Sequence, residues 1–362
     1  MKARKSAGFS LLLVIVVCAV LVIGVSVLLH GYSVKAAAQE TIWHEMETEP
    51  SDQLLRQTEQ TKLFRLNSEA LKKVLSGAPM EAANGLPNGL PNGLADSGTV
   101  LTVPMPDGKL ARFRIQESPI LESPLAERYP EIKSYRGQGI DDASITMRAD
   151  WSPQGFHALV LGTGEAFTVL PVARGNTTIY SSSNANQLTD KLRCEVDDSK
   201  VVYHEPNTPQ AVTAAVGGTL RIYRIAIATT SEYSSQYGGG DVGQTIASIN
   251  TWLNSLNAIY KKELSVRLNL IGNNSQVVYT SEPDPFTNGD GSAMLVQVRT
   301  TLRDQIGTAN YDVGHVFGTG GSGVAYVGVV CSAAADGNGP FKGGGVSLMS
   351  GAAGNSTYVG LW

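Results

Sequence analysis

The second half of the sequence alternates between apolar runs rich in β-branched residues and amphipathic stretches with helical spacing. The run Leu220 to Thr229 predicts a buried strand. Asp241 and Gln244 form a capping box, so a long helix is expected to begin there. Its apolar stripe, at spacings of three and four, is Val242, Ile246, Ile249, Leu253, Leu256 and Tyr260.

The same alternation continues to residue 349. A second helix is expected from a cap at Ser292 along the face of Leu295, Val298, Leu302 and Ile306, with Gly307 ending it in a left-handed conformation. The further strands are expected at Leu264 to Ile271, with an irregular extension at Gln276 to Tyr279, then at Tyr311 to Phe317, Val324 to Cys331 and Gly345 to Met349. Strands separated by helices form mostly parallel sheets with crossover connections, so the sequence predicts an α/β fold.

The first half has a different pattern. Residues 39–97 are predicted to be a helical and linker segment. Helical spacing at residues 39–80 predicts one or two short helices, and the Asn-Gly-Leu-Pro repeat at 84–94 that follows is typical of a linker. Residues 98–204 are predicted to be a strand-rich domain, and residues 205–218, rich in small residues and proline, a connector. The expected strands are Val100 to Val103, Leu110 to Ile115, Ser144 to Arg148, Gly155 to Leu161, Glu165 to Pro171 and Thr177 to Tyr180.

The first 38 residues form a targeting segment. Lys2, Arg4 and Lys5 precede an uncharged apolar run at residues 9–29, and Ala36 to Ala38 resembles a signal-peptide cleavage site. Two readings remain open, a cleaved signal peptide and a retained anchor on the outer face of the cytoplasmic membrane, and both export the rest of the chain. The formal charge of −4, without long blocks of one sign, indicates no nucleic-acid partner.

An ordered series of motifs carries a family resemblance. The segment Arg221 to Tyr233 is followed by Asn257 to Tyr260, Tyr279 to Gly289, Asn310 to Phe317 and Gly323 to Cys331. In this order they resemble the landmarks of bacterial reprolysin-like (adamalysin-type, metzincin) zinc metallopeptidases. The resemblance implies a metzincin-like mixed sheet with crossover helices, incomplete in this chain, at residues 219–362. The strand-rich domain before it is similar in position and size to a propeptide.

The resemblance also defines what is missing. In that family the next element is a helix with the motif H-E-x-x-H-x-x-G-x-x-H, whose histidines bind zinc and whose glutamate is the general base. Tyr358 and Val359 resemble the start of this helix, but the 362 residues contain no H-E-x-x-H. We therefore expect no catalytic residue and no metal ligand in this chain, although a complete domain would hold zinc. His315 and Asp312 are expected to be structural.

Two features could contribute to function without the zinc helix. Cys194, shortly before the connector, is a candidate propeptide thiol that would occupy the open zinc position; a buried thiol or a disulfide with Cys331 are the alternatives. The resemblance places an antiparallel edge strand, along which peptide substrates pair, at Val324, Ala325, Tyr326, Val327 and Gly328.

These observations predict an exported zinc metallo-endopeptidase family member that acts on peptides or proteins. A complete domain would hydrolyse peptide bonds by zinc-activated water, whereas this chain is expected to be inactive. The alternative is a non-enzymatic exported binding or adhesion module that uses the sheet edge. Whether a missing helix reflects a natural truncation, a frameshift or a fragment boundary is left open.

Overall fold

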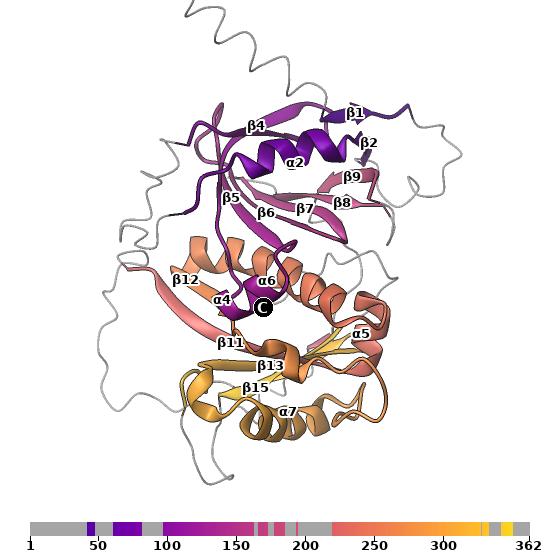
Figure 1. Cartoon of the computed structure of the whole chain (residues 1–362), viewed down its shortest axis with the longest axis vertical. Helices are drawn as coiled ribbons and strands as arrows, with labels where there is room; N and C mark the ends of the chain where they lie inside the picture. The colour runs from indigo at the N-terminus through magenta and orange to yellow at the C-terminus, as the bar shows by residue number, and fades with distance from the viewer. Residues whose placement is uncertain are drawn as a thin grey trace, which may run out of the picture.

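The computed structural model describes two β-sheets with a long helix between them (Figure 1). It covers residues 42–47, 61–81, 97–162, 166–172, 177–184, 193–194, 219–326, 328–332 and 342–349. Within these residues, no helix is long and apolar enough to cross a membrane. Four sequence predictions lie outside them, namely the targeting run at 9–29, the repeat at 84–94, the connector at 205–218 and the helix start at Tyr358 and Val359.

The upstream sheet is antiparallel throughout and has the strand order β1-β2-β9-β8-β7-β6-β5-β4-β3. Its strands are β1 (Trp43–Glu45), β2 (Lys62–Leu66), β3 (Val100–Pro104), β4 (Leu110–Glu117), β5 (Lys133–Gly139), β6 (Thr146–Ser152), β7 (Gly155–Leu161), β8 (Ala166–Pro171) and β9 (Ile179–Asn184). Helix α2 (Ser68–Ser76) covers one face and buries Leu71 and Leu75 in a core with Phe64, Phe113 and Tyr180.

Three of these strands differ from the sequence prediction. Helical spacing was read across residues 39–80, yet β1 and β2 are strands, and only α2 is a helix in the described part of that stretch. The reason is tertiary, because β2 pairs with the distant β9 and thereby buries Leu63, Phe64 and Leu66. Strand β5 was missed because its sequence, KSYRGQG, is polar and rich in glycine.

The second sheet is mixed, with the order β10-β14-β15-β13-β11-β12. Its strands are β10 (Arg193–Cys194), β11 (Arg221–Thr229), β12 (Val266–Leu270), β13 (Val313–Thr319), β14 (Ser322–Ala325) and β15 (Gly343–Met349). Strands β12, β11, β13 and β15 are parallel, and β14 runs antiparallel to β15. The predicted α/β class is confirmed.

Three helices accompany this sheet. Helix α6 (Val242–Leu264) begins at the predicted cap, where the Asp241 carboxylate accepts a 2.8 Å hydrogen bond from the Gln244 backbone N–H. Helix α7 (Gly291–Gln305) begins earlier than predicted, because Asp290 rather than Ser292 caps it. Gly307 follows with a positive φ of 83°, but its ψ of 134° lies outside the left-handed helical region. The short helix α5 (Ser231–Gly238) packs on α6.

The predicted fourth strand, Val324 to Cys331, is a strand only at its beginning. Strand β14 contains Val324 and Ala325, and Tyr326 still donates a hydrogen bond to the Gly344 carbonyl at 2.8 Å. Gly328 then adopts a positive φ of 74°, which turns the chain away from the sheet. The predicted edge therefore ends near Tyr326; Val327 lies outside the described residues.

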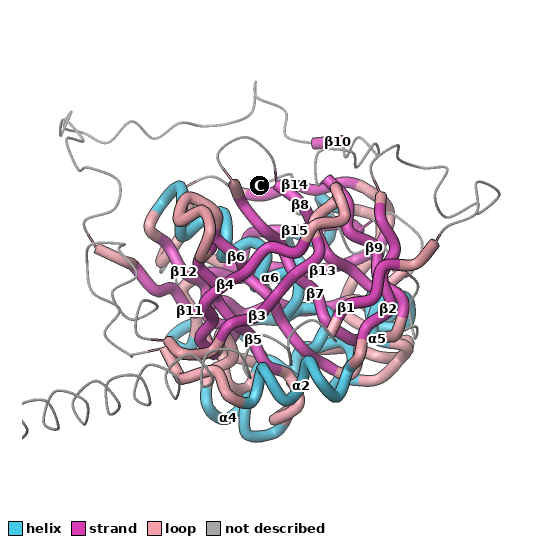
Figure 2. Tube along the Cα trace, turned by 90° about the horizontal axis from the view of Figure 1, so that it is seen from above, coloured by secondary structure: helices cyan, strands magenta, loops and turns pink. Residues whose placement is uncertain are grey.

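Helix α6 lies between the two sheets (Figure 1). It packs on β12 of the second sheet and on β6 and β7 of the upstream sheet. In Figure 2, viewed from above, the strands of the two sheets overlap in projection, and α6 is labelled among them. The helix is therefore buried along much of its length, from Thr245 to Asn254.

Candidate functional site

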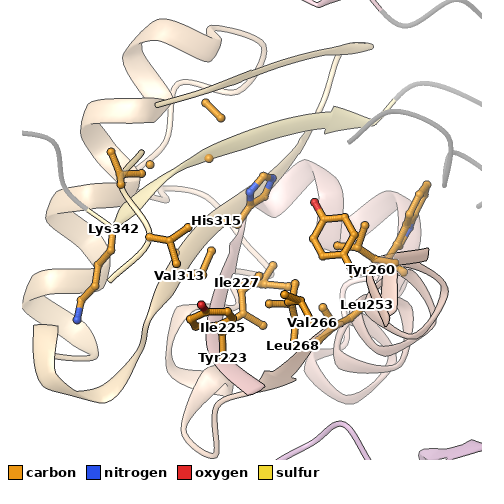
Figure 3. Close-up of a pocket in the computed structure, with 18 of the residues that line it drawn as sticks. Tyr223, Ile225, Ile227, Leu253, Tyr260, Val266, Leu268, Val313, His315 and Lys342 are labelled. Carbon is orange, nitrogen blue, oxygen red and sulfur yellow. The ribbon is translucent and has the colours of Figure 1, made fainter. Parts of the chain in front are cut away.

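A pocket of about 410 Å³ opens on the second sheet beside α6 (Figure 3). Its floor is formed by β11, β12 and β13, and one wall by the α6 residues Trp252, Leu253, Leu256, Tyr260 and Leu264. The opposite side includes the end of β14 and the turn that follows it. Met349, the last residue of β15, also lines the pocket, so the chain leaves the sheet directly beside it.

The rim of this pocket exposes large apolar side chains. Leu264, Tyr326 and Val330 line it and are 56%, 42% and 53% exposed, respectively. Contiguous apolar surface of this kind marks a contact site in soluble proteins. The pocket is therefore better suited to being covered by an apolar segment than to binding a charged small molecule.

One buried donor in the pocket wall lacks a partner. Trp252 is only 5% exposed, and within the part of the chain that the structure describes its indole Nε1 makes no hydrogen bond. A buried N–H without an acceptor costs about 1–3 kcal/mol. Trp252 therefore carries an unsatisfied buried donor on α6.

His315 lines the pocket from β13 but has the environment of a structural residue. Its Nε2 lies 2.9 Å from the Ser347 hydroxyl on β15, and its ring packs edge-on against Phe317. Burial lowers the pKa of His315 to about 3, so the imidazole is neutral at ordinary pH. The prediction of a hydrogen-bonded structural histidine is confirmed.

Asp312 is structural as well. Its carboxylate accepts hydrogen bonds from the Arg224 backbone N–H at 2.8 Å and from the guanidinium at 2.8 and 3.2 Å. These bonds lower the pKa of Asp312 and link Arg224 of β11 to the residue directly before β13. The predicted strand-end carboxylate therefore holds neighbouring strands in register.

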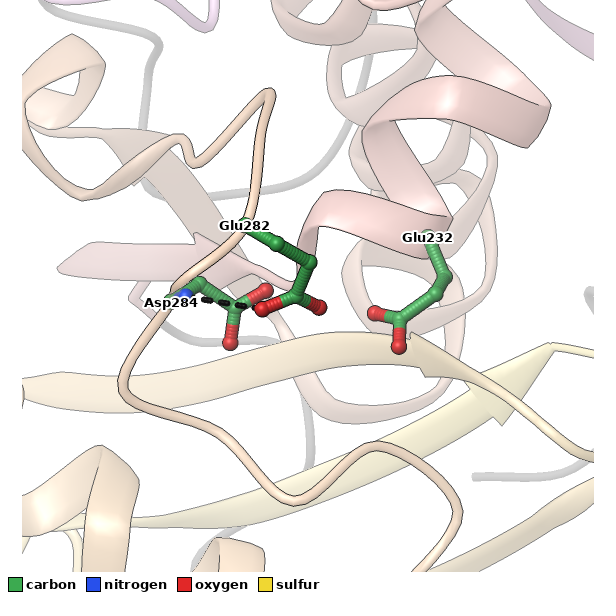
Figure 4. Close-up of side chains that lie close together, drawn as sticks. All are labelled: Glu232, Glu282 and Asp284. Atoms are coloured by element: carbon green, nitrogen blue, oxygen red, sulfur yellow. Dashed lines mark hydrogen bonds between the residues drawn. The ribbon is translucent and has the colours of Figure 1, made fainter.

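Three acidic side chains come together at the start of α5, a cluster that the sequence did not suggest (Figure 4). Oxygens of Glu232, Glu282 and Asp284 lie within 4.8 Å of one another. Asp284 accepts the Ser231 backbone N–H at 2.6 Å, and Glu282 accepts the Ser231 hydroxyl at 2.9 Å. Since these bonds satisfy a free donor in the first turn of the helix, we assign the cluster to helix capping.

The predicted substrate edge and Cys194 meet in the structure. Strand β10 pairs in parallel with β14, with Arg193 opposite Ser322 and Cys194 opposite Gly323. The edge of β14 that faces away from β15 is thus covered by a segment from the upstream half of the chain. Cys331 is an exposed free thiol, so the alternative of a Cys194–Cys331 disulfide does not hold in this structure.

The mixed sheet, its helices and the apolar pocket together form an α/β unit. Residues 219–359 match the model of the reprolysin-like metallopeptidases of family M12B. Among solved structures, metalloproteinase-II from Bacteroides fragilis is 11% identical with a TM-score of 0.42, covering 77% of this chain and 79% of that one. No curated protein sequence matches the chain.

Proposed function

We propose that residues 219–359 are the substrate-binding part of an exported zinc metallo-endopeptidase domain, with export directed by residues 9–29. The observation that carries this proposal is the family match of these residues, and the open apolar pocket beside α6 leaves room for a further element of the domain. When bound, zinc would activate a water molecule for attack on the peptide bond. The residues described here would bind and orient the peptide.

The pocket is proposed as the seat of the zinc-binding helix. It is apolar, and it lies where β15 ends at Met349. In the family resemblance the helix follows Tyr358 and Val359, only a short distance along the chain. Such a helix would cover the exposed rim residues Leu264 and Tyr326.

Residues 1–362 by themselves are proposed to hold no catalytic zinc. The sequence contains no H-E-x-x-H motif, and His315, the histidine in the pocket wall, already faces Ser347. Among the described residues, the cluster able to approach a metal is the exposed acidic one at α5, which lacks histidine. Catalytic zinc sites use three protein ligands, usually including histidines.

The edge of β14 is proposed to bind an extended peptide through backbone hydrogen bonds. Strand β10 already occupies this edge, so a substrate would have to displace it. We propose that the upstream segment keeps the site latent in this way, with the thiol of Cys194 as the group that would face zinc in a complete domain. The alternative of a binding module that uses a free sheet edge is less well supported, because β10 covers that edge.

Elemental analysis tests the proposal. Purified residues 1–362 should contain no stoichiometric zinc, whereas a chain extended by an H-E-x-x-H-x-x-G-x-x-H helix should contain one zinc and cleave peptides. An extended chain with the motif glutamate changed to Gln is the matched control, expected to keep zinc and lose cleavage. One tightly bound zinc in residues 1–362 would contradict the proposal.

A further inference from the structure

We call the described part of residues 42–194 the upstream unit and the described part of residues 219–349 the second unit. The segment between β4 and β5 leaves the upstream sheet and packs against the second unit. We call residues 118–132 the docking segment; it contains the short helix α4 (Ser123–Arg128). The Leu270 backbone N–H donates to the Ile120 carbonyl at 2.7 Å, and the Glu122 N–H donates to the Leu270 carbonyl at 2.9 Å. Leu121 and Leu270 form a parallel bridge, so the docking segment covers the outer edge of β12.

The docking segment also supplies part of the second unit's core. Ile120, Leu121, Leu125 and Ile132 are all less than 9% exposed and pack in one cluster with residues of β11, β12 and α6. The upstream sheet has its own separate cluster, built around Phe64, Phe113 and Tyr180. These four side chains thus lie between two strands of the upstream sheet in the sequence, but they are buried in the core of the second unit.

Two glycines of the second unit make room for this segment. A Cβ at Gly272 would lie 3.0 Å from the ring of Pro124, and a Cβ at Gly243 would lie 3.1 Å from the ring of Tyr129. The Gly272 N–H also donates to the Glu122 carboxylate at 2.8 Å. The fit is therefore close on both sides of α4.

A polar seam along α6 supplements the apolar contact. Asn254 accepts a hydrogen bond from Arg148 at 2.8 Å and donates one to the Ala149 carbonyl at 2.8 Å. Thr251 donates to Asp150 at 2.7 Å, and Glu81 pairs with Arg267 at 3.1 Å. Buried polar groups of both units thus satisfy one another across the seam.

We infer that the upstream unit is a separable partner which stays bound to the reprolysin-like unit after the connecting chain is cut, and that the docking segment is its main anchor. A shared apolar core is characteristic of interfaces that persist, whereas a polar seam alone resembles a transient one. Because β10 belongs to the same upstream region, an upstream unit held in this way remains available to the β14 edge. The inference concerns binding between the units and requires no zinc or peptidase activity.

The experiment uses the full chain with a site-specific protease site inserted in residues 205–218. After complete cutting, the two fragments should elute together in size-exclusion chromatography, and dilution with a fluorescent label on one fragment gives the dissociation constant. Separation of the unaltered fragments at micromolar concentration would overturn the inference.

Three variants assign the anchor. Gly272→Val should raise the dissociation constant roughly 10- to 100-fold, as loss of a central interface contact does. Gly243→Ala should raise the dissociation constant by a smaller factor. Because alanine favours a helix more than glycine does, the substitution does not weaken α6 itself, and weaker binding would be due to the contact of the new methyl group with Tyr129. Leu71→Ala removes a buried side chain from the upstream core away from the docking segment and should leave the constant unchanged.

Folding of each uncut variant is checked by circular dichroism, and Gly272→Ala serves as the milder substitution if Gly272→Val does not fold. Unchanged binding in Gly272→Val and Gly243→Ala, with loss of binding in Arg148→Met, would assign the anchor to the polar seam and overturn the role of the docking segment. A failure of zinc binding in the extended chain would leave these outcomes unaffected, so the two proposals can fail separately.

Discussion

The two sheets differ in how completely they bury their own apolar surface. The upstream sheet is antiparallel, and together with α2 it encloses a core in which Phe64, Phe113 and Tyr180 are at most 1% exposed. The second sheet receives four core residues from the docking segment and still leaves a pocket of about 410 Å³ beside α6. The comparison teaches that the upstream sheet and α2 enclose their own core, whereas the core of the second sheet includes side chains from the docking segment.

The largest expected effect comes from opening the closed core. Phe113→Ala should lower the free energy of unfolding by about 3–5 kcal/mol, because it leaves a cavity among well-packed neighbours. Leu264→Ala, at the 56% exposed rim of the pocket, should change it by less than about 0.5 kcal/mol. Urea denaturation of both variants measures the difference. Equal losses would show that the rim is as tightly packed as the upstream core.

A second prediction concerns the charge that links the two units. Burial alone would raise the pKa of Glu81, but the positive charges of Lys261, Arg136 and Arg267 and a hydrogen bond from Ser118 lower it to about 2. Its stabilising contribution is therefore complete above pH 4.5 and is lost as the pH falls towards 2. Glu81→Gln should lower the free energy of unfolding at pH 7 by about 2–3 kcal/mol.

The pH dependence provides the control for that variant. Stability of the unaltered chain should fall between pH 4.5 and pH 2, and the part of this fall due to Glu81 should disappear in Glu81→Gln. Thermal unfolding followed across this range measures it. Identical acid profiles for the two proteins would mean that Glu81 contributes no coupling between the units.

A smaller effect is expected from Lys261 at the same seam. Burial lowers the pKa of Lys261 from 10.5 to about 8, although the charge of Glu81 acts in the opposite direction. The unfolded chain then binds more protons than the folded one between pH 8 and pH 10.5, so stability should rise with pH across this window. Because a third of this side chain is exposed, we expect about 1 kcal/mol, absent in Lys261→Met.

The smallest expected effect tests whether the pocket receives an apolar element. In residues 1–362, Tyr326→Ser should change the free energy of unfolding by less than about 0.5 kcal/mol, because the side chain is 42% exposed. In the chain extended by the zinc helix, the same substitution should cost about 1 kcal/mol or more, since the helix would bury the tyrosine. Parallel urea titrations compare the two chains. An equal effect in both would argue that the helix seats elsewhere.

The sequence predicted best the elements that carry local signals. Helix α6 was located from its cap at Asp241 and its apolar stripe, and β11 and β13 from runs rich in β-branched residues. Strands β1 and β2 were missed because their burial depends on pairing with β9, which no local pattern records. Strand β14 ends early, at a turn that the apolar run Val324 to Cys331 concealed.

The candidate site was also predictable only in part, because its residues come together through long-range contacts. Cys194 and the edge strand were identified separately, but only the fold brings β10 against β14. The environment of Glu81 is built from Arg136, Lys261 and Arg267, which are far apart in the sequence. The acidic cluster at α5 joins Glu232 to residues fifty positions later, so charge patterning along the chain could not reveal it.

The position of the docking segment has a consequence for how such chains can diverge. Because Pro124 and Tyr129 lie against Gly272 and Gly243, substitutions on one side restrict those tolerated on the other. Exchanging upstream units between related proteins at the connector would therefore separate residues that must change together. A workable exchange would have to move residues 118–132 together with Gly243 and Gly272. These residues lie on both sides of the connector at 205–218, so the connector is not a suitable point of exchange.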